Sequence, residues 1–198
     1  MAQPSRFRYE GLTRWWKGNL HVHSTRSDGG KTPAELAVLY AGAGYDFIVL
    51  ADHWVAGVPD DLPRPSPLTV LDGVELDGDD STGANFHVVC IGCRGGIDRT
   101  MGLEAGMAEA RRQGAVLVLA HPLWTGNSAE DALRHGFDGV EELSPKGRRT
   151  RARLTLDGCL TGARLAKGRA AGALAEIMSG SRCSSTGHYA CRYRANVT

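Results

Sequence analysis

Six short runs with the pattern of strands restrict how this chain can fold more than any other feature of its sequence. They cover Lys17–Ser24, Tyr45–Asp52, Leu68–Glu75, Asn85–Gly92, Ala115–His121 and Gly139–Leu143. One of them, Tyr45–Asp52 (YDFIVLAD), is a short apolar run typical of a buried strand. Because helix-forming segments lie between several of them, the sequence predicts an α/β fold with a parallel sheet or barrel.

The segment between the first two runs has the start and stop signals of a helix. Thr32 can cap the helix, Pro33 suits the first helical position, and Glu35 stands where a capping box requires an acid. Gly44 can end the helix. Two neighbouring strands joined through one helix are expected to be parallel. Further helices are predicted over Thr100–Gln113 and Ser128–His135.

Histidines gather where the predicted strands end, which is where sites form in α/β sheets and barrels. Five of the seven histidines have this position: His21, His23, His53, His87 and His121. His21 and His23 are two residues apart, so both point to one face of a strand and can reach one cation. Asp28 and Glu75 add carboxylates nearby. Mixed nitrogen and carboxylate ligands suit zinc, manganese or iron.

Each residue of this set also has a simpler explanation. His121 precedes Pro122, as a strand terminator would, and His87 fits a packed core histidine equally well. Glu75 lies in an acidic stretch that could be solvated, and His135 on a predicted helix is expected at the surface. The ordered set of motifs, each at a strand end, is a much stronger indication of a metal site than any one member.

Three neighbours of the histidines carry separate expectations. Asp52 would point away from His53 in a regular strand, so we expect it to support a ligand or cap a loop. Trp54 follows His53, and Trp124 follows the fifth strand. These two indoles fit an aromatic wall beside a substrate or ordinary loop packing equally well.

Seven short motifs within roughly residues 15–143 resemble one known family. They are Gly18–Ser24 (GNLHVHS), Ser27–Gly29, Gly44–Phe47, Ala51–His53, Gly73–Glu75, Asn85–His87 and Ala120–Pro122. As a set they resemble the PHP (polymerase and histidinol phosphatase) metallohydrolases. The opening motif and the segment GYDFIVLADH look most like the carbaryl-hydrolase-like branch of that family.

The resemblance implies a distorted seven-stranded (β/α) barrel that holds two or three divalent ions of zinc, manganese or iron. It implies seven ligands: His21, His23, Asp28, His53, Glu75, His87 and His121. Glu75 would bridge two ions, and Glu75 and His121 are the predicted catalytic residues. Family members hydrolyse phosphate esters or nucleotides, and some cleave carbamate-like bonds. The expected nucleophile is a hydroxide made available by the metals.

The chain departs from the family pattern after Leu143. The pattern ends with a late Asp-x-His pair, which this sequence lacks, and only six strands are predicted, so we expect an incomplete barrel. Residues 1–143 contain 12 Lys and Arg against 20 Asp and Glu, a balance of −8, whereas residues 144–198 contain 11 against 2, a balance of +9. We therefore expect a PHP-like metal-binding segment over 1–143 and a basic, irregular or helical tail over 144–198. A frameshift or gene truncation is our hypothesis for this change.

The sequence is compatible with three functions. The first is an enzyme, a metal-dependent hydrolase acting on a small phosphate ester. The second is a catalytically inactive PHP remnant that binds metal or ligand without turnover. The third is a nucleic-acid-binding module that uses the basic run 146–153, which the acidic main segment disfavours. Neither a secretory signal nor a long apolar run is found, so we expect a cytoplasmic protein without a membrane partner. The missing strand makes self-association an open expectation.

Overall fold

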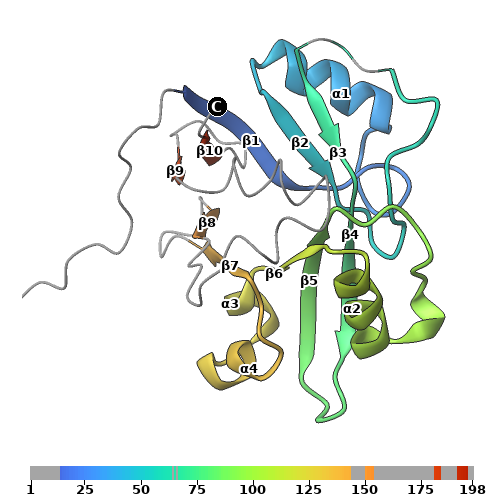
Figure 1. Ribbon diagram of the computed structural model, residues 1–198, viewed down its shortest axis with the longest axis vertical. Helices are drawn as coiled ribbons and strands as arrows, with labels where there is room; N and C mark the ends of the chain where they lie inside the picture. The colour runs from blue at the N-terminus through green and yellow to red at the C-terminus, as the bar shows by residue number, and fades with distance from the viewer. Residues whose placement is uncertain are drawn as a thin grey trace, which may run out of the picture.

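The computed structural model describes residues 14–63, 65, 67–143, 150–153, 181–183 and 191–195 (Figure 1). Its strands are β1 (Arg14–Val22), β2 (Phe47–Leu50), β3 (Thr69–Leu71), β4 (Gly73–Asp79), β5 (Asn85–Ile91), β6 (Val116–Leu119), β7 (Gly139–Leu143), β8 (Thr150–Arg153), β9 (Ser181–Cys183) and β10 (Cys191–Ala195). Its helices are α1 (Pro33–Gly42), the 3-10 turn η1 (Arg99–Met101), α2 (Leu103–Arg112), α3 (Pro122–Thr125) and α4 (Ala129–Arg134).

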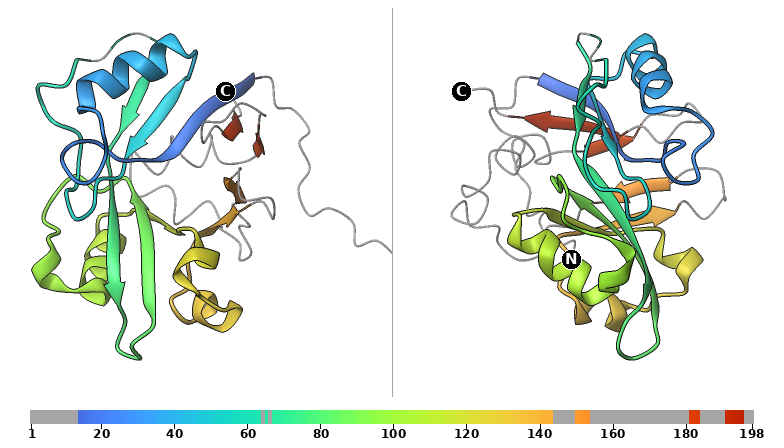
Figure 2. Two further views of the ribbon diagram at one scale, coloured as in Figure 1. Left: turned by 180° about the vertical axis from the view of Figure 1, so that it is seen from behind. Right: turned by 90° about the vertical axis from the view of Figure 1, so that its right-hand side faces the viewer.

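The strands form two five-stranded sheets, which Figures 1 and 2 show one above the other. The first has the order β3-β2-β1-β10-β9 and the second the order β4-β5-β6-β7-β8. The α/β class is confirmed, as is the parallel pairing of β1 with β2. The described strands do not close into a barrel, however, and β4, β5 and β6 pair antiparallel. The turn between β4 and β5 is too short for the crossover that parallel strands need.

The two sheets meet where the chain passes from β3 to β4. The sequence predicted a single strand over Leu68–Glu75, but the structure interrupts it at Asp72. A Cβ on Gly73 would lie 2.4 Å from Val49 Cγ1 and 2.9 Å from the Leu50 carbonyl oxygen, so this close approach requires glycine. Glu75 consequently lies near the start of β4 rather than at the end of a strand. A parallel bridge between His53 and Glu75 joins the sheets.

Local sequence signals account for helix α1. Thr32 Oγ1 accepts a hydrogen bond from the Glu35 amide at 3.2 Å, and a Glu35 carboxylate oxygen accepts from the Thr32 amide at 2.8 Å. Both halves of the predicted capping box are therefore present. Gly44 follows the helix with φ of +69°, a conformation that glycine adopts without strain. The predicted start and end of this helix are confirmed.

Three clusters of buried apolar side chains hold the elements together. One lies between α1 and its sheet and includes Leu36, Ile48 and Val70. A second lies between α2 and the other sheet and includes Phe86 and Met107. The third joins strands of both sheets, since it contains Leu20, Phe47, Val89 and Val118. Because this third cluster packs β1 and β2 against β5 and β6, it fixes the junction at which the histidines meet.

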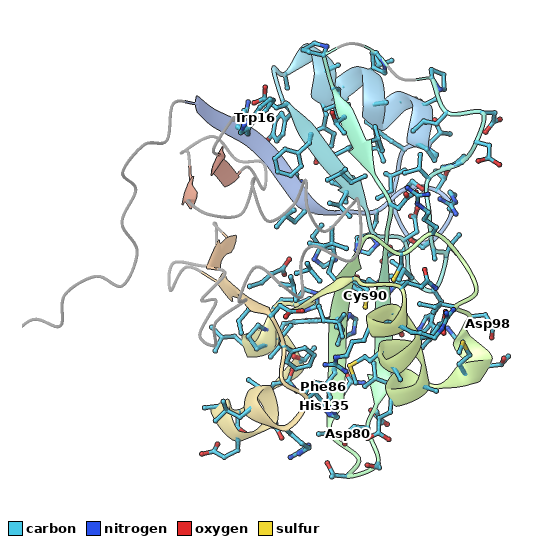
Figure 3. The ribbon with its side chains drawn as sticks, in the orientation of Figure 1. Trp16, Asp80, Phe86, Cys90, Asp98 and His135 are labelled. Carbon is cyan, nitrogen blue, oxygen red and sulfur yellow. The ribbon has the colours of Figure 1, made fainter. Side chains whose placement is uncertain are left out.

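A buried carboxylate ties the tip of the β4–β5 hairpin to α4. Asp80 accepts a hydrogen bond from Arg134 at 2.7 Å and lies 3.0 Å from His135 Nε2. Hydrogen bonds from Thr82, Arg134 and His135 hold the pKa of Asp80 well below its usual range despite burial. The His135 ring packs edge-on against Phe86, with ring centroids 4.9 Å apart (Figure 3). The prediction of a surface role for His135 is wrong, because the hairpin folds back onto the helix.

Three short strands of the predicted tail lie among the described residues. β8 pairs antiparallel with β7, and β10 pairs antiparallel with both β1 and β9. At these positions the expectation of an irregular or helical tail is wrong, since the edges of β7 and β1 offer backbone partners that no local pattern reveals. Residues 162–180, whose alanine-rich sequence would suit one helix, lie outside the described residues. In the described part of the chain, no helix is long and apolar enough to cross a membrane.

Candidate metal centre

Five histidine rings and four carboxylates meet at the junction of the two sheets. The first histidines are His21 on β1 and His23 one residue beyond it. His53 forms the bridge between the sheets, His87 lies on β5, and His121 follows β6 at the start of α3. The strand ends that the sequence singled out therefore converge in space.

Glu75 is the centre of this cluster. Its carboxylate is buried, at 1% exposure, so the alternative of a solvated acid is wrong. One oxygen, Oε2, lies 2.9 Å from His21 Nε2, 2.9 Å from His23 Nε2 and 3.4 Å from His53 Nε2. The other, Oε1, lies 2.9 Å from His87 Nδ1 and 3.3 Å from His121 Nε2. The two oxygens thus face two separate sets of imidazoles.

The backbone around Glu75 fixes its position. Its amide donates to the Asp52 carbonyl oxygen at 3.3 Å, and its own carbonyl oxygen accepts from the Trp54 amide at 3.0 Å. Imidazole hydrogen bonds outweigh burial and hold the pKa of Glu75 far below its usual range. Glu75 is therefore an anion at neutral pH, surrounded by nitrogen donors.

His21 and His23 approach each other as the period of two predicted. Their Nε2 atoms are 2.8 Å apart. Burial would lower the pKa of His21, but the charge of Glu141 and hydrogen bonds with Glu141 and Glu75 raise it to about 10. A strongly shifted pKa inside a cluster of charged partners is typical of a functional site.

Asp28 reaches the cluster from the loop after β1. Its Oδ1 lies 3.4 Å from His23 Nδ1 and its Oδ2 lies 3.7 Å from His53 Nε2, although the side chain is 69% exposed. The loop is held by Asp52, whose carboxylate accepts from the Ser24 amide at 2.6 Å, the Ser24 hydroxyl at 2.8 Å and the Ser27 hydroxyl at 2.9 Å. The supporting role expected of Asp52 is confirmed.

Four groups of side chains within this cluster could each hold a metal ion. They are His21-His23-Glu75, His53-Glu75-His87, His23-Asp28-His53 and His21-His121-Glu141, with ligand atoms within 4.8 Å of one another in each group. Every ligand implied by the family resemblance belongs to at least one group. Among the described residues, the buried His121 Nδ1 has no hydrogen-bond partner. This converging set of imidazole nitrogens and carboxylate oxygens fits divalent transition metals.

Two acids of the cluster were missed by the sequence reasoning. Asp77 Oδ1 lies 2.8 Å from His53 Nδ1, and the Asp77 carboxylate accepts two hydrogen bonds from Arg99. Since Asp77 lies two residues after Glu75 on one strand, the period of two could have found it. Glu141 lies 2.9 Å from His21 Nδ1. No spacing in the sequence connects Glu141 with His21.

The two tryptophans have different positions. Trp54 is buried, and its indole nitrogen donates to the Asp77 carbonyl oxygen at 3.2 Å, so it packs within the structure. Trp124 is 70% exposed. Its ring lies edge-on beside His87 and His121, with centroids 5.2 and 5.1 Å away. Only Trp124 has the position that an aromatic wall beside the site requires.

Comparison with known proteins gives similarity in structure alone. No family model matches the chain, and no curated protein matches it. One similar solved structure is a two-domain protein from Bacteroides vulgatus ATCC 8482 containing a predicted PHP-like metal-dependent phosphoesterase, at 20% identity and a TM-score of 0.49, over 66% of this chain and 45% of that one. Another similar structure is that of a protein from Bifidobacterium adolescentis ATCC 15703 that is predicted to be a metal-dependent phosphoesterase. It has 16% identity and a TM-score of 0.46, over 66% of this chain and 80% of that one.

The chain spans less than half of the Bacteroides protein, so that protein's activity does not transfer to it. What the structure defines is an α/β protein with a histidine-rich cluster that could hold metal ions. This protein is structurally similar to PHP-like metal-dependent phosphoesterases.

Proposed function

We propose that the protein is a metal-dependent hydrolase of the PHP type that acts on a small phosphate ester. The observation that carries the proposal is the buried Glu75 carboxylate, whose two oxygens face five imidazoles. Buried carboxylates surrounded by imidazole nitrogens are typical of metal sites. The proposed ligands are the seven that the family resemblance implies: His21, His23, Asp28, His53, Glu75, His87 and His121.

Glu75 is proposed to act as the shared ligand of two ions. His21 and His23 accompany its Oε2, whereas His87 and His121 accompany its Oε1. Zinc, manganese or iron bound there would supply an activated water near neutral pH and would neutralise the negative charge of a phosphate group. Glu75 lies between the two sets and His121 belongs to the second, and we propose the catalytic roles for these two residues.

The protein's own residues supply the positioning. Asp77, held by Arg99, orients His53 through Nδ1, which leaves Nε2 directed at Glu75. Asp28 is the exposed carboxylate of the cluster, so it faces the side from which a substrate can arrive. Trp124 is exposed beside His87 and His121 and can exclude water from a substrate bound there.

The test measures metal content and hydrolysis together. The purified full chain is dialysed, and zinc, manganese and iron per chain are measured by mass spectrometry beside turnover of 4-nitrophenyl phosphate. The double variant His21→Ala/His23→Ala removes two ligands, and Glu130→Gln on exposed α4 is the control. We expect two or more ions and turnover in the wild-type and control proteins, and loss of both in the double variant. A wild-type chain that binds neither intrinsic nor added metal would refute the proposal.

A second function competes because the late Asp-x-His pair is missing from the sequence. In that alternative the chain is a remnant that binds metal without turnover. The same experiment separates the two. Tight binding of two ions without hydrolysis of any phosphate ester would favour the remnant, whereas turnover that depends on the bound metal would favour the enzyme.

A further inference from the structure

We propose that Glu141 is a positioning residue of the candidate metal centre, holding His21 in the orientation that directs its Nε2 into the cluster. The inference rests on the proposed metal site and assigns a role to a residue outside the set of seven ligands. It concerns a carboxylate that reaches the cluster from β7, the last strand of the segment that resembles the PHP family.

The register of the second sheet brings Glu141 to the cluster. β7 pairs in parallel with β6, so that Leu119 lies opposite Val140. One residue further along both strands, Glu141 comes level with the point at which the chain leaves β6 toward His121. The Glu141 carboxylate accepts from the His121 amide at 3.1 Å. With 5% exposure, Glu141 is buried there.

The contact between Glu141 and His21 defines which ring nitrogen faces the cluster. Glu141 Oε1 lies 2.9 Å from His21 Nδ1, while His21 Nε2 lies 2.9 Å from Glu75 Oε2. When a cation displaces the Nε2 proton, an acid acceptor keeps the other proton on Nδ1, so Nε2 becomes the atom that can bind the cation. Glu141 thereby selects the tautomer of His21 that can serve as a ligand.

A second histidine of the cluster provides an internal comparison. His53 Nδ1 lies 2.8 Å from Asp77 Oδ1, and His53 Nε2 faces Glu75 Oε2 at 3.4 Å. The same arrangement of acid, imidazole and cluster therefore occurs twice, with both acids, on β4 and β7, in the second sheet. Asp77 retains 20% exposure of its side chain and is shared with Arg99, whereas the side chain of Glu141 is 7% exposed.

Glu141 also supports His121 through the backbone. His121 has φ of +29°, which side-chain-bearing residues rarely adopt and which costs free energy unless surrounding contacts hold it. The hydrogen bond from the His121 amide to Glu141 Oε2 is one such contact. One carboxylate thus positions two of the proposed ligands, His21 and His121. The sequence lacks the late Asp-x-His pair of the family.

The experiment uses Co²⁺ as the probe, because its visible absorption reports the ligands around the ion. The metal-free full chain and the variants Glu141→Gln and Glu141→Asp are titrated with Co²⁺, and affinity and absorption spectrum are recorded. Loss of such a supporting acid typically weakens metal binding about 10–100-fold. We expect that loss for Glu141→Gln together with a changed spectrum, and partial recovery for Glu141→Asp. Glu130→Gln serves as the matched control.

The outcomes separate this inference from the proposed function. If wild-type protein binds Co²⁺ and Glu141→Gln has the same affinity and spectrum, the role of Glu141 is refuted and the metal centre stands. If wild-type protein binds no Co²⁺, the metal centre itself is refuted, and the role of Glu141 with it. Should Glu141→Gln lose its native circular dichroism, Glu141→Asp decides: its shorter side chain withdraws the acid from His21 Nδ1, so wild-type affinity with the wild-type spectrum in that variant overturns the inference.

Discussion

The loop that carries Asp28 should depend on the buried carboxylate of Asp52. Asp52 is 0% exposed and accepts three hydrogen bonds, from the Ser24 amide, the Ser24 hydroxyl and the Ser27 hydroxyl. Arg26 adds a guanidinium 3.9 Å away. The informative perturbation is Asp52→Asn, which keeps the shape of the side chain but removes its charge.

The expected magnitude follows from these bonds. A hydrogen bond to a charged group contributes roughly 1.5–3 kcal/mol and a neutral one roughly 0.5–1.5 kcal/mol, so each bond weakens by about 1 kcal/mol. Asp52→Asn should therefore lower the free energy of unfolding by about 2–3 kcal/mol. Asp52→Ala also leaves the buried Ser24 amide without this acceptor and should lower it by about 4–5 kcal/mol.

Urea denaturation followed by circular dichroism measures both variants. Asp60→Asn, in the exposed loop after β2, is the matched control and should change the free energy of unfolding by less than about 0.5 kcal/mol. Asp52→Asn should also lower the melting temperature by roughly 5–10 °C for a chain of this size. If Asp52→Asn and Asp60→Asn were equally harmless, the reasoning that this carboxylate organises the loop would be refuted.

Three further predictions concern the substrate, the hairpin and the metal. Trp124→Ala should raise KM for phenyl phosphate about tenfold with little change in kcat, because one stacked aromatic group contributes on the order of 1–3 kcal/mol. Trp124→Phe should keep a KM close to that of the wild-type protein. Equal KM values for the wild-type protein and Trp124→Ala would contradict the aromatic wall. Asp80→Asn should lower the melting temperature by several degrees at neutral pH. Since the pKa of Asp80 is depressed in the folded protein, its contribution is present above the unfolded pKa of about 3.9 and is lost as pH falls below it, so the two melting curves should converge in acid. Zinc at about 100 times its Kd should stabilise the fold by about 2.7 kcal/mol, and EDTA should reverse this in a thermal melt.

Much of the fold could be predicted because its signals are local. The capping box of Thr32 and Glu35 lies within one helical turn, and the helix it starts was predicted correctly. The described strands form two separate sheets in place of the expected incomplete barrel, because the sheet in which a strand pairs is decided by partners far along the chain. The short strands β8 and β10 were missed for the same reason.

The sequence by itself determined which side chains have metal-binding chemistry. His21 and His23 share a face by the period of two, and Glu75 and His121 stand in motifs of specific spacing. Only the tertiary structure decided that these residues meet, and that Glu141 joins them at a separation of 120 residues from His21. It also decided that Trp54 is buried while Trp124 borders the site. The physical reason is that local patterns fix the direction of a side chain along its own strand, whereas the pairing and packing of the two sheets fix what that side chain faces.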